Sequence, residues 1–220
     1  RSFYNKFQTV KNLFFDKRIF SFLIIVYLMN LAPDFGSLII YYMTDVLKFL
    51  PSDISNFNTF AISCYTLGLL AYSMFFQKIN PKKVFLVTNI LLFIFNISFF
   101  AVVFNWLDQF HISNKIFCLF TTGATSLLSE MNYMPVLAIW YSITPTNLIA
   151  TSLTLFTGVI NITTMLSKYI GAGILIALKI NKYNLTEIGK PLLIQNMYFC
   201  FTILLIFFIK GLGFGVWGLG

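Results

Sequence analysis

Three ionisable side chains stand inside long apolar stretches of the sequence: Asp34, Glu130 and Lys168. An ionisable residue near the centre of a membrane helix costs about 2.5 to 3.5 kcal/mol on insertion scales, so it normally faces the protein interior. Residues of this kind have a partner or belong to a substrate, ion or proton pathway. They are therefore the first candidates for function in this chain.

Glu130 and Lys168 lie on successive predicted helices, and two interpretations of them remain open. In the structural one, the two opposite charges form an ion pair, because a buried charge without a partner is strongly destabilising. In the functional one, Lys168 binds a carboxylate of a solute and Glu130 accepts a proton. The sequence does not decide between the two.

Asp34 follows Pro33 directly and precedes Gly36 within one predicted helix. Proline removes a backbone hydrogen bond and bends a helix, so we expect a kink at this point. Asp34 would then cap the second half of the broken helix through its side chain. Alternatively, it belongs to a solute site, because transporters place binding sites at broken helices.

The segment 147–178 is predicted to form a helix with one continuously hydrophilic side. This side comprises Thr157, Asn161, Thr164 and Lys168, at spacings of three and four residues. Ser167 and Gly171 in the same segment are a pair of small residues four positions apart, which lets helix backbones approach closely. A helix that faced only lipid would not keep the hydrophilic face.

Two aromatic residues, Tyr133 and Phe156, could stack on a flat heterocyclic solute. Trp140, close to a predicted helix end, is assigned instead to the aromatic belt at the membrane interface. The residues proposed to bind solute are therefore Asp34, Glu130, Tyr133, Phe156, Asn161 and Lys168.

The composition indicates a membrane protein: 58% of the residues are hydrophobic and 10% are charged. The net charge of +8 comes from Lys and Arg in short segments between apolar runs, rather than from a patch on a soluble fold. We therefore expect no nucleic-acid partner. One His, three Cys without a CxxC pair, and no nucleophile with a matching base argue against an enzyme, a metal site or a cofactor.

Six apolar segments are long enough to cross a bilayer, which predicts an all-α, multi-pass helix bundle. They lie at about 19–44, 56–77, 83–105, 116–140, 147–178 and 192–210. Nine Lys and Arg fall on the side of residues 1–18 and five on the other side, so the positive-inside rule places both ends in the cytoplasm. Residues 1–18 would form a cytoplasmic lead-in, 19–210 one membrane domain, and 211–220 a glycine-rich end.

The order of several residues resembles the second half of the folate-biopterin transporter family, over residues 19–208. The residues that carry the resemblance are Pro33, Tyr41, Tyr42, Leu47, Gly68, Tyr72, Lys82, Lys83, Met134, Pro135, Thr144, Pro145, the stretch 155–161, Ser167, Gly171 and Ala172. The chain departs from the family pattern at two positions. Thr144 stands where the family has Cys, and Ile149 where it has an acidic residue.

The resemblance implies the carboxy-terminal, six-helix half of a major facilitator fold, with an amino-terminal half as partner. It further implies proton symport of folate-like or pterin-like anions across the plasma membrane or an organelle membrane. Two alternatives stay open, because a fold does not fix a substrate. One is a carrier of another small solute on the same fold, and the other is a membrane scaffold that transports nothing.

Overall fold

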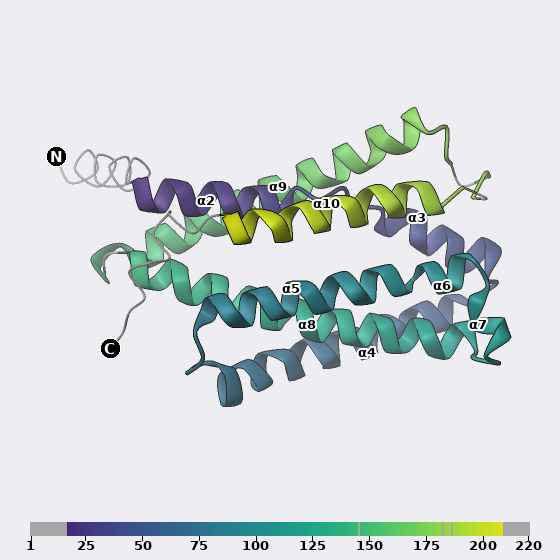
Figure 1. The fold of residues 1–220 in the computed structure, drawn as a ribbon, viewed down its shortest axis with the longest axis horizontal. Coiled ribbons are helices and arrows are strands. Elements are labelled where there is room, and N and C mark those ends of the chain that lie inside the picture. The colour runs from purple at the N-terminus through teal and green to yellow at the C-terminus, as the bar shows by residue number, and fades with distance from the viewer. Residues whose placement is uncertain (1–16, 145, 182, 186, 209–220) are drawn as a thin grey trace.

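The computed structural model describes residues 17–208 except 145, 182 and 186 (Figure 1). Most of the predicted lead-in and all of the glycine-rich end lie outside these residues. The regular elements of the described part are helices: α2 (Lys17–Asn30), α3 (Gly36–Tyr41), the π-helix η1 (Tyr42–Val46), α4 (Pro51–Ala71), the π-helix η2 (Tyr72–Phe76), α5 (Pro81–Ser98), α6 (Phe100–Val103), α7 (Trp106–Gln109), α8 (Asn114–Ile143), the 3₁₀ turn η3 (Thr146–Leu148), α9 (Ile149–Ala177) and α10 (Gly189–Phe208).

The all-α membrane architecture predicted from composition is confirmed, and each predicted apolar segment coincides with a helical run. Three runs in the described part are long and apolar enough to cross a membrane: Pro51–Phe76, Pro81–Val103 and Ile149–Ala177. The first apolar segment is divided between α2 and α3, and α8 is long but carries many polar residues. Six membrane crossings stay a prediction.

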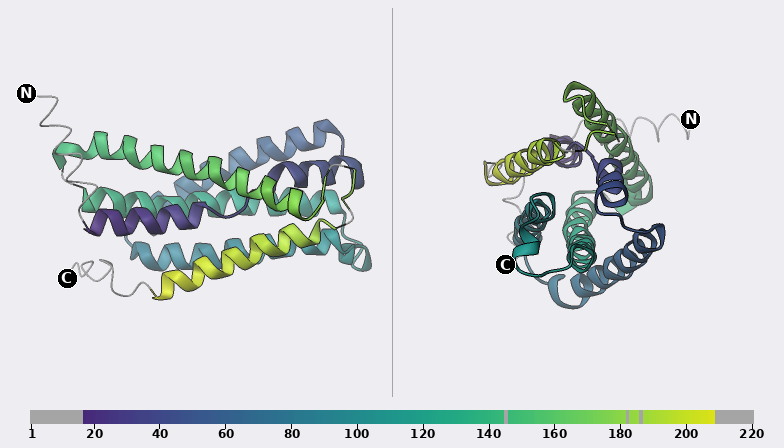
Figure 2. Two further views of the ribbon diagram at one scale, coloured as in Figure 1. Left: turned by 90° about the horizontal axis from the view of Figure 1, so that it is seen from above. Right: turned by 90° about the vertical axis from the view of Figure 1, so that its right-hand side faces the viewer.

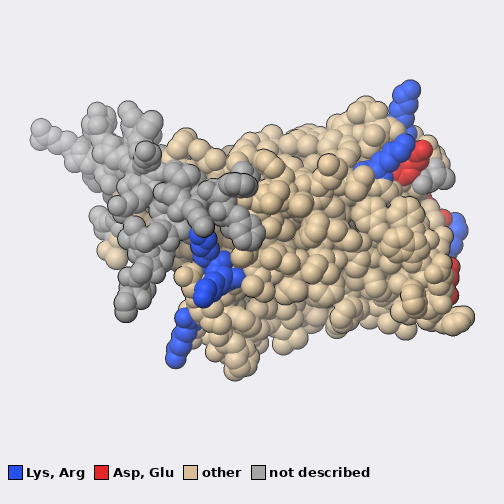
Figure 3. All heavy atoms as spheres, in the orientation of Figure 1, with Lys and Arg blue, Asp and Glu red and all other residues tan. Residues whose placement is uncertain are grey.

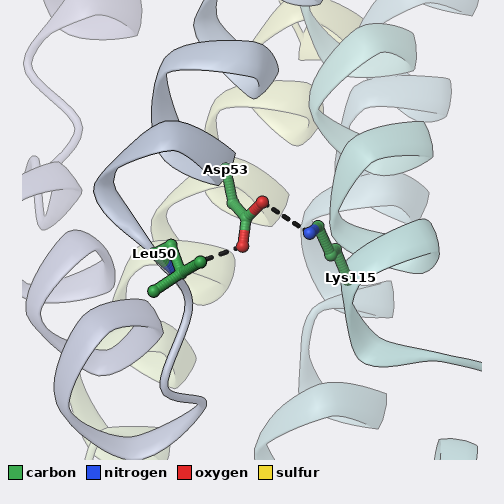
Figure 4. Close-up of polar contacts among 3 residues, drawn as sticks. All are labelled: Leu50, Asp53 and Lys115. Atoms are coloured by element: carbon green, nitrogen blue, oxygen red, sulfur yellow. Dashed lines mark hydrogen bonds and ion pairs between the residues drawn. The ribbon is translucent and has the colours of Figure 1, made fainter.

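Prolines and side-chain caps explain where α4 and α5 begin. Pro51 and Pro81 occupy the first position of their helices, where the missing backbone N–H has no cost. The Asp53 carboxylate accepts the Leu50 N–H at 3.2 Å, and the Asn80 side chain accepts the Lys82 N–H at 3.0 Å. Asp53 also forms an ion pair with Lys115 at 2.5 Å, which joins the starts of α4 and α8 (Figure 4).

The helices lie roughly side by side along the long axis of the molecule, and α8 is central (Figures 1 and 2). It packs against both α4 and α5, whereas α9 packs mainly against α2, and α10 against α5 and α2. Two main apolar clusters lie toward opposite ends of the bundle: one contains Phe35, Val102 and Ile188, and the other contains Trp140 and Phe156. The interior polar groups described below lie largely between these clusters.

The break predicted at Pro33 is present, and α9 packs directly against it. Helix α2 ends at Asn30 and α3 begins at Gly36. The Asp34 N–H donates to the Ser167 carbonyl at 3.3 Å, and the Ser167 hydroxyl donates to the Ala32 carbonyl. A Cβ on Gly171 would lie 2.2 Å from the Asp34 carbonyl oxygen. The small residues of α9 therefore make a contact between two main chains, as their spacing predicts.

Charged side chains gather at the two ends of the molecule, and the middle of the visible face is uncharged (Figure 3). Lys78 lies between η2 and α5, and Lys82 and Lys83 lie in the first turn of α5. Four other acidic residues lie toward the opposite end, in η1, in α4, in α7 and before α10: Asp45, Asp53, Asp108 and Glu187. Asp16 lies outside the described residues. This distribution agrees with a basic cytoplasmic end, and the orientation itself stays a prediction.

Candidate solute and proton site

The hydrophilic face of α9 is turned away from the core of the bundle. Its four residues, Thr157, Asn161, Thr164 and Lys168, are all exposed. The two threonine hydroxyls donate to carbonyls of their own helix, at 2.9 Å and 3.0 Å. The buried residues of α9 form a separate stripe that contains Phe156, Thr163 and Ser167. Lys168 is therefore the charged residue of this exposed hydrophilic face.

Glu130 and Lys168 do not pair, so the structural interpretation of these charges is wrong. The ion pairs found among the described residues are Lys115 with Asp53 and Lys190 with Glu187. The reason lies in the packing, because α8 faces α4 and α5 while α9 faces α2. Helices that follow each other in the sequence are here not the closest neighbours in space.

Glu130 points instead toward α4. Its side chain is 3% exposed, and its Oε2 has no hydrogen-bond partner. A Cβ on Gly68 would lie 3.2 Å from the Glu130 Cβ and 2.4 Å from the Leu127 carbonyl oxygen, so glycine permits this close approach. The Tyr65 hydroxyl lies beside the carboxyl group. A buried carboxyl with one free oxygen can accept a proton without breaking an ion pair.

A buried polar network connects α5 to α8. Thr88 and Asn89 are each 2% exposed, and both donate to the Asn132 Oδ1 at 2.8 Å. The Asn89 amide also donates to the Phe85 carbonyl at 2.7 Å. A network with its donors satisfied is favourable in a low-dielectric interior and holds the two helices in one register.

Beside this network is a cavity of about 250 Å³ between α2, α5, α8, α9 and α10. Its polar lining is neutral and comprises Asn30, Asn89, Ser129, Asn132, Tyr133 and Thr202. Of the residues predicted to bind solute, Tyr133 lines this cavity. A drug-sized ligand normally needs a pocket of roughly 300 to 1,000 Å³, so the cavity alone would hold only part of a large solute.

The predicted site residues occupy different parts of the structure. Asn161 and Lys168 lie on the open face of α9, Glu130 lies against α4, and Tyr133 lines the cavity. Phe156 is fully buried and stacks on Trp140, with ring centroids 4.8 Å apart. The six predicted residues thus surround no single pocket among the described residues.

Asp34 and Trp140 are placed by local packing. The Asp34 carboxylate accepts the Gly36 N–H at 2.8 Å, which is the capping arrangement considered above.

The prediction that Trp140 belongs to an interfacial belt is wrong, since the ring is 2% exposed and lies between Phe22 and Phe156. A belt residue presents its ring to the headgroups, whereas this ring fills the core.

Comparison with known sequences decides the family. A sequence model of the BT1 family matches residues 2–211. The chain belongs to the BT1 family, the folate-biopterin transporters. It is 24% identical over 190 residues to Folate transporter 1 of Plasmodium falciparum (isolate 3D7), which is 86% of this chain and 37% of that protein. The chain thus spans well under half the length of this curated relative. No solved structure matches it.

The two departures from the folate-biopterin transporter pattern lie near the connection from α8 to α9. Thr144 is buried, and its hydroxyl donates to the Trp140 carbonyl at 2.8 Å, which caps the end of α8. Ile149 is the first residue of α9 and is half-buried. Ile149 thus replaces the acidic residue of the family pattern at the N-terminus of α9. A carboxylate would be favourable there because it interacts with the positive end of the helix dipole.

Sequence reasoning missed the network of Thr88, Asn89 and Asn132. Each of these residues is a single polar position within an apolar or mixed segment, so none of them forms a pattern alone. The available signal was the cost of placing an unpaired amide in a membrane helix, which requires a partner on a neighbouring helix. Pairing Asn89 with Asn132 needs the additional knowledge that α5 packs against α8.

Proposed function

We propose that this chain is the carboxy-terminal half of a proton-coupled carrier for folate-like or pterin-like organic anions. Membership of the folate-biopterin transporter family supports this function, and so does the name of the Plasmodium relative. The observation that carries the proposal is the open hydrophilic face of α9, which ends in Lys168. Folates are carboxylates, and a lysine ammonium is a suitable partner for them.

The amino-terminal half of the transporter would cover this face. Helix α4 carries a second exposed line of hydroxyl residues: Ser55, Thr59, Ser63 and Thr66. The hydroxyls of Thr59, Ser63 and Thr66 donate to carbonyls of α4 itself, as Thr59 does to the Ser55 carbonyl at 3.0 Å. Seen end-on, α4 and α9 extend from one side of the bundle while α5 and α10 lie on the other (Figure 2). Two polar helix faces on one side favour a water-filled path between two halves over contact with lipid.

In this mechanism Lys168 holds the anionic end of the solute, and Asn161 offers an amide about two helical turns away from it. Tyr133 and Phe156 are proposed for the heterocycle, with Tyr133 reached through the cavity. Phe156 would first have to leave its stack on Trp140. Glu130 accepts the symported proton at its free oxygen. Rocking of one half against the other then exposes the solute to each side of the membrane in turn.

Uptake of labelled folate and of a labelled pterin tests this proposal in cells that express the full-length protein. Lys168→Gln should reduce saturable uptake by tenfold or more, since loss of a buried ionic contact costs about 2 kcal/mol or more. Lys168→Arg should retain part of the activity because it keeps the charge.

The matched control is Lys83→Gln, which removes an exposed charge at the basic end of the molecule. Surface labelling must show equal amounts of each variant. Uptake that is unchanged in Lys168→Gln would exclude Lys168 from the solute site. Absence of folate and pterin uptake by the wild type, with competition by another solute, would favour a different carrier on the same fold. Absence of any transported solute would favour a scaffold.

A further inference from the structure

A second, smaller cavity of about 140 Å³ lies between α3, η1, α5, α8 and α10, apart from the residues assigned to solute and proton. More than half of its lining side chains are polar: Asn96, Thr121, Thr122, Thr125, Gln195 and Asn196. No Lys, Arg, Asp or Glu is among the residues that line it. The remaining lining is apolar and includes Ile39, Met43 and Phe99.

The two asparagine side chains of this lining each donate one hydrogen bond to a carbonyl of their own helix. The side-chain amides of Asn96 and Asn196 donate to the Leu92 and Leu192 carbonyls, each at 2.9 Å. Only the NH₂ group of an asparagine can donate to a carbonyl, so this bond fixes which end of the amide is oxygen. Each amide therefore uses one of its two N–H donors within its own helix and keeps its Oδ1 as an acceptor.

Two of the three threonines in the lining, Thr121 and Thr125, also donate to carbonyls of their own helix. The Thr121 hydroxyl donates to the Phe117 carbonyl at 2.9 Å, and the Thr125 hydroxyl donates to the Thr121 carbonyl at 2.8 Å. A hydroxyl has one hydrogen and two lone pairs, so each threonine oxygen keeps acceptor capacity. Four side chains on three helices thus contribute oxygen acceptors: the amide oxygens of Asn96 and Asn196 and the hydroxyl oxygens of Thr121 and Thr125.

One of these acceptors has no partner. Asn196 is 5% exposed, and its Oδ1 forms no hydrogen bond with the protein. A buried polar atom without a partner costs about 1 to 3 kcal/mol, so native proteins normally satisfy it with water, an ion or a ligand. The cavity that Asn196 lines is the place from which such a partner can come.

We propose that this cavity binds a monovalent alkali-metal cation, Na⁺ or K⁺. Amide and hydroxyl oxygens are hard ligands of the kind that such cations prefer over nitrogen or sulfur. The absence of a carboxylate from the lining favours one positive charge over two. The volume is too small for a drug-sized solute and suits an ion with one or two waters. The bound cation would join α10 to α5 and α8.

Thermal unfolding of the purified full-length protein tests this site without any transport measurement. At constant ionic strength, NaCl or KCl should raise the Tm saturably relative to N-methyl-D-glucamine chloride, since a ligand that binds only the folded state stabilises it. Asn196→Leu and Thr125→Val each remove one oxygen at similar size. Each should raise the half-saturating salt concentration by about tenfold or more, on the scale of other altered metal sites.

Asn196→Asp provides a variant with the opposite expectation, because a carboxylate should lower the half-saturating concentration. Asn30→Leu is the matched control. Asn30 makes the same bond to its own helix, donating to the Val26 carbonyl at 2.9 Å, but it lines the larger cavity. Equal Tm values in all three salts would mean that the cavity holds water only. A saturable shift whose half-saturating salt concentration is unchanged in Asn196→Leu, Asn196→Asp and Thr125→Val would place the cation elsewhere. Either result would overturn the proposal, and neither depends on folate uptake.

Discussion

Gly171→Ala is expected to reduce the amount of folded protein in the membrane to near background. The new Cβ would lie 2.2 Å from the Asp34 carbonyl oxygen, 3.1 Å from its carbon and 3.2 Å from the Asp34 nitrogen. These are main-chain atoms, so no side-chain rotation can relieve the clash. Overpacking in a protein interior costs about 1 to 3 kcal/mol and occasionally more, and here α9 would have to separate from the break after α2.

Gly173→Ala is the matched control, since it lies on the same helix and a Cβ there meets nothing within 4 Å. Detergent extraction followed by size-exclusion chromatography measures the folded fraction of both variants. Gly158→Ala offers a second control for the same reason. If Gly171→Ala and Gly173→Ala gave equal yields and equal Tm values, the close contact between α9 and Asp34 would be refuted.

Glu130→Gln is expected to abolish the stimulation of uptake at acid pH. Glutamine keeps the size of the side chain but cannot take up and release a proton. The expression level should remain normal, because Glu130 forms no ion pair among the described residues and the substitution leaves no partner charge unpaired. At acid external pH we expect uptake to fall by tenfold or more, while exchange of solute without net proton movement is retained.

Uptake and exchange should be measured at two or more external pH values with equal surface expression. Asp108→Asn serves as the control because it neutralises an exposed carboxylate in α7. A steep pH dependence that persists in Glu130→Gln would assign the proton to another group. Tyr65→Phe tests the neighbouring hydroxyl, and its effect should be smaller because the carboxyl itself remains.

The sequence predicts the helices well because membrane helices are defined by local properties. Apolar runs mark each helix, and Pro33 with Gly36 marks the break between α2 and α3. Close packing at Ser167 and Gly171 follows from the rule that small residues permit close approach, although the rule does not identify the break as the partner. Each of these features depends on residues within one segment or on a spacing of four.

Features that depend on which helices are neighbours could not be predicted in the same way. The supposed ion pair of Glu130 and Lys168 assumed that successive helices pack together, but Glu130 lies against Gly68 of α4. The position of Trp140 near a helix end suggested an interface, but packing with Phe156 buries it. The acceptor-lined cavity around Asn196 involves three helices that are distant in the sequence. Only the three-dimensional arrangement brings its oxygens together.

The main-chain contact between α9 and the break also has a mechanical consequence. Because Ser167 is bonded to both Ala32 and Asp34, the broken helix and α9 cannot slide past each other without losing these bonds. Lys168 follows Ser167 directly, so a force on its side chain acts one residue away from the joint. A displacement of Lys168 would therefore move the break at Pro33, and the adjoining ends of α2 and α3, together with α9.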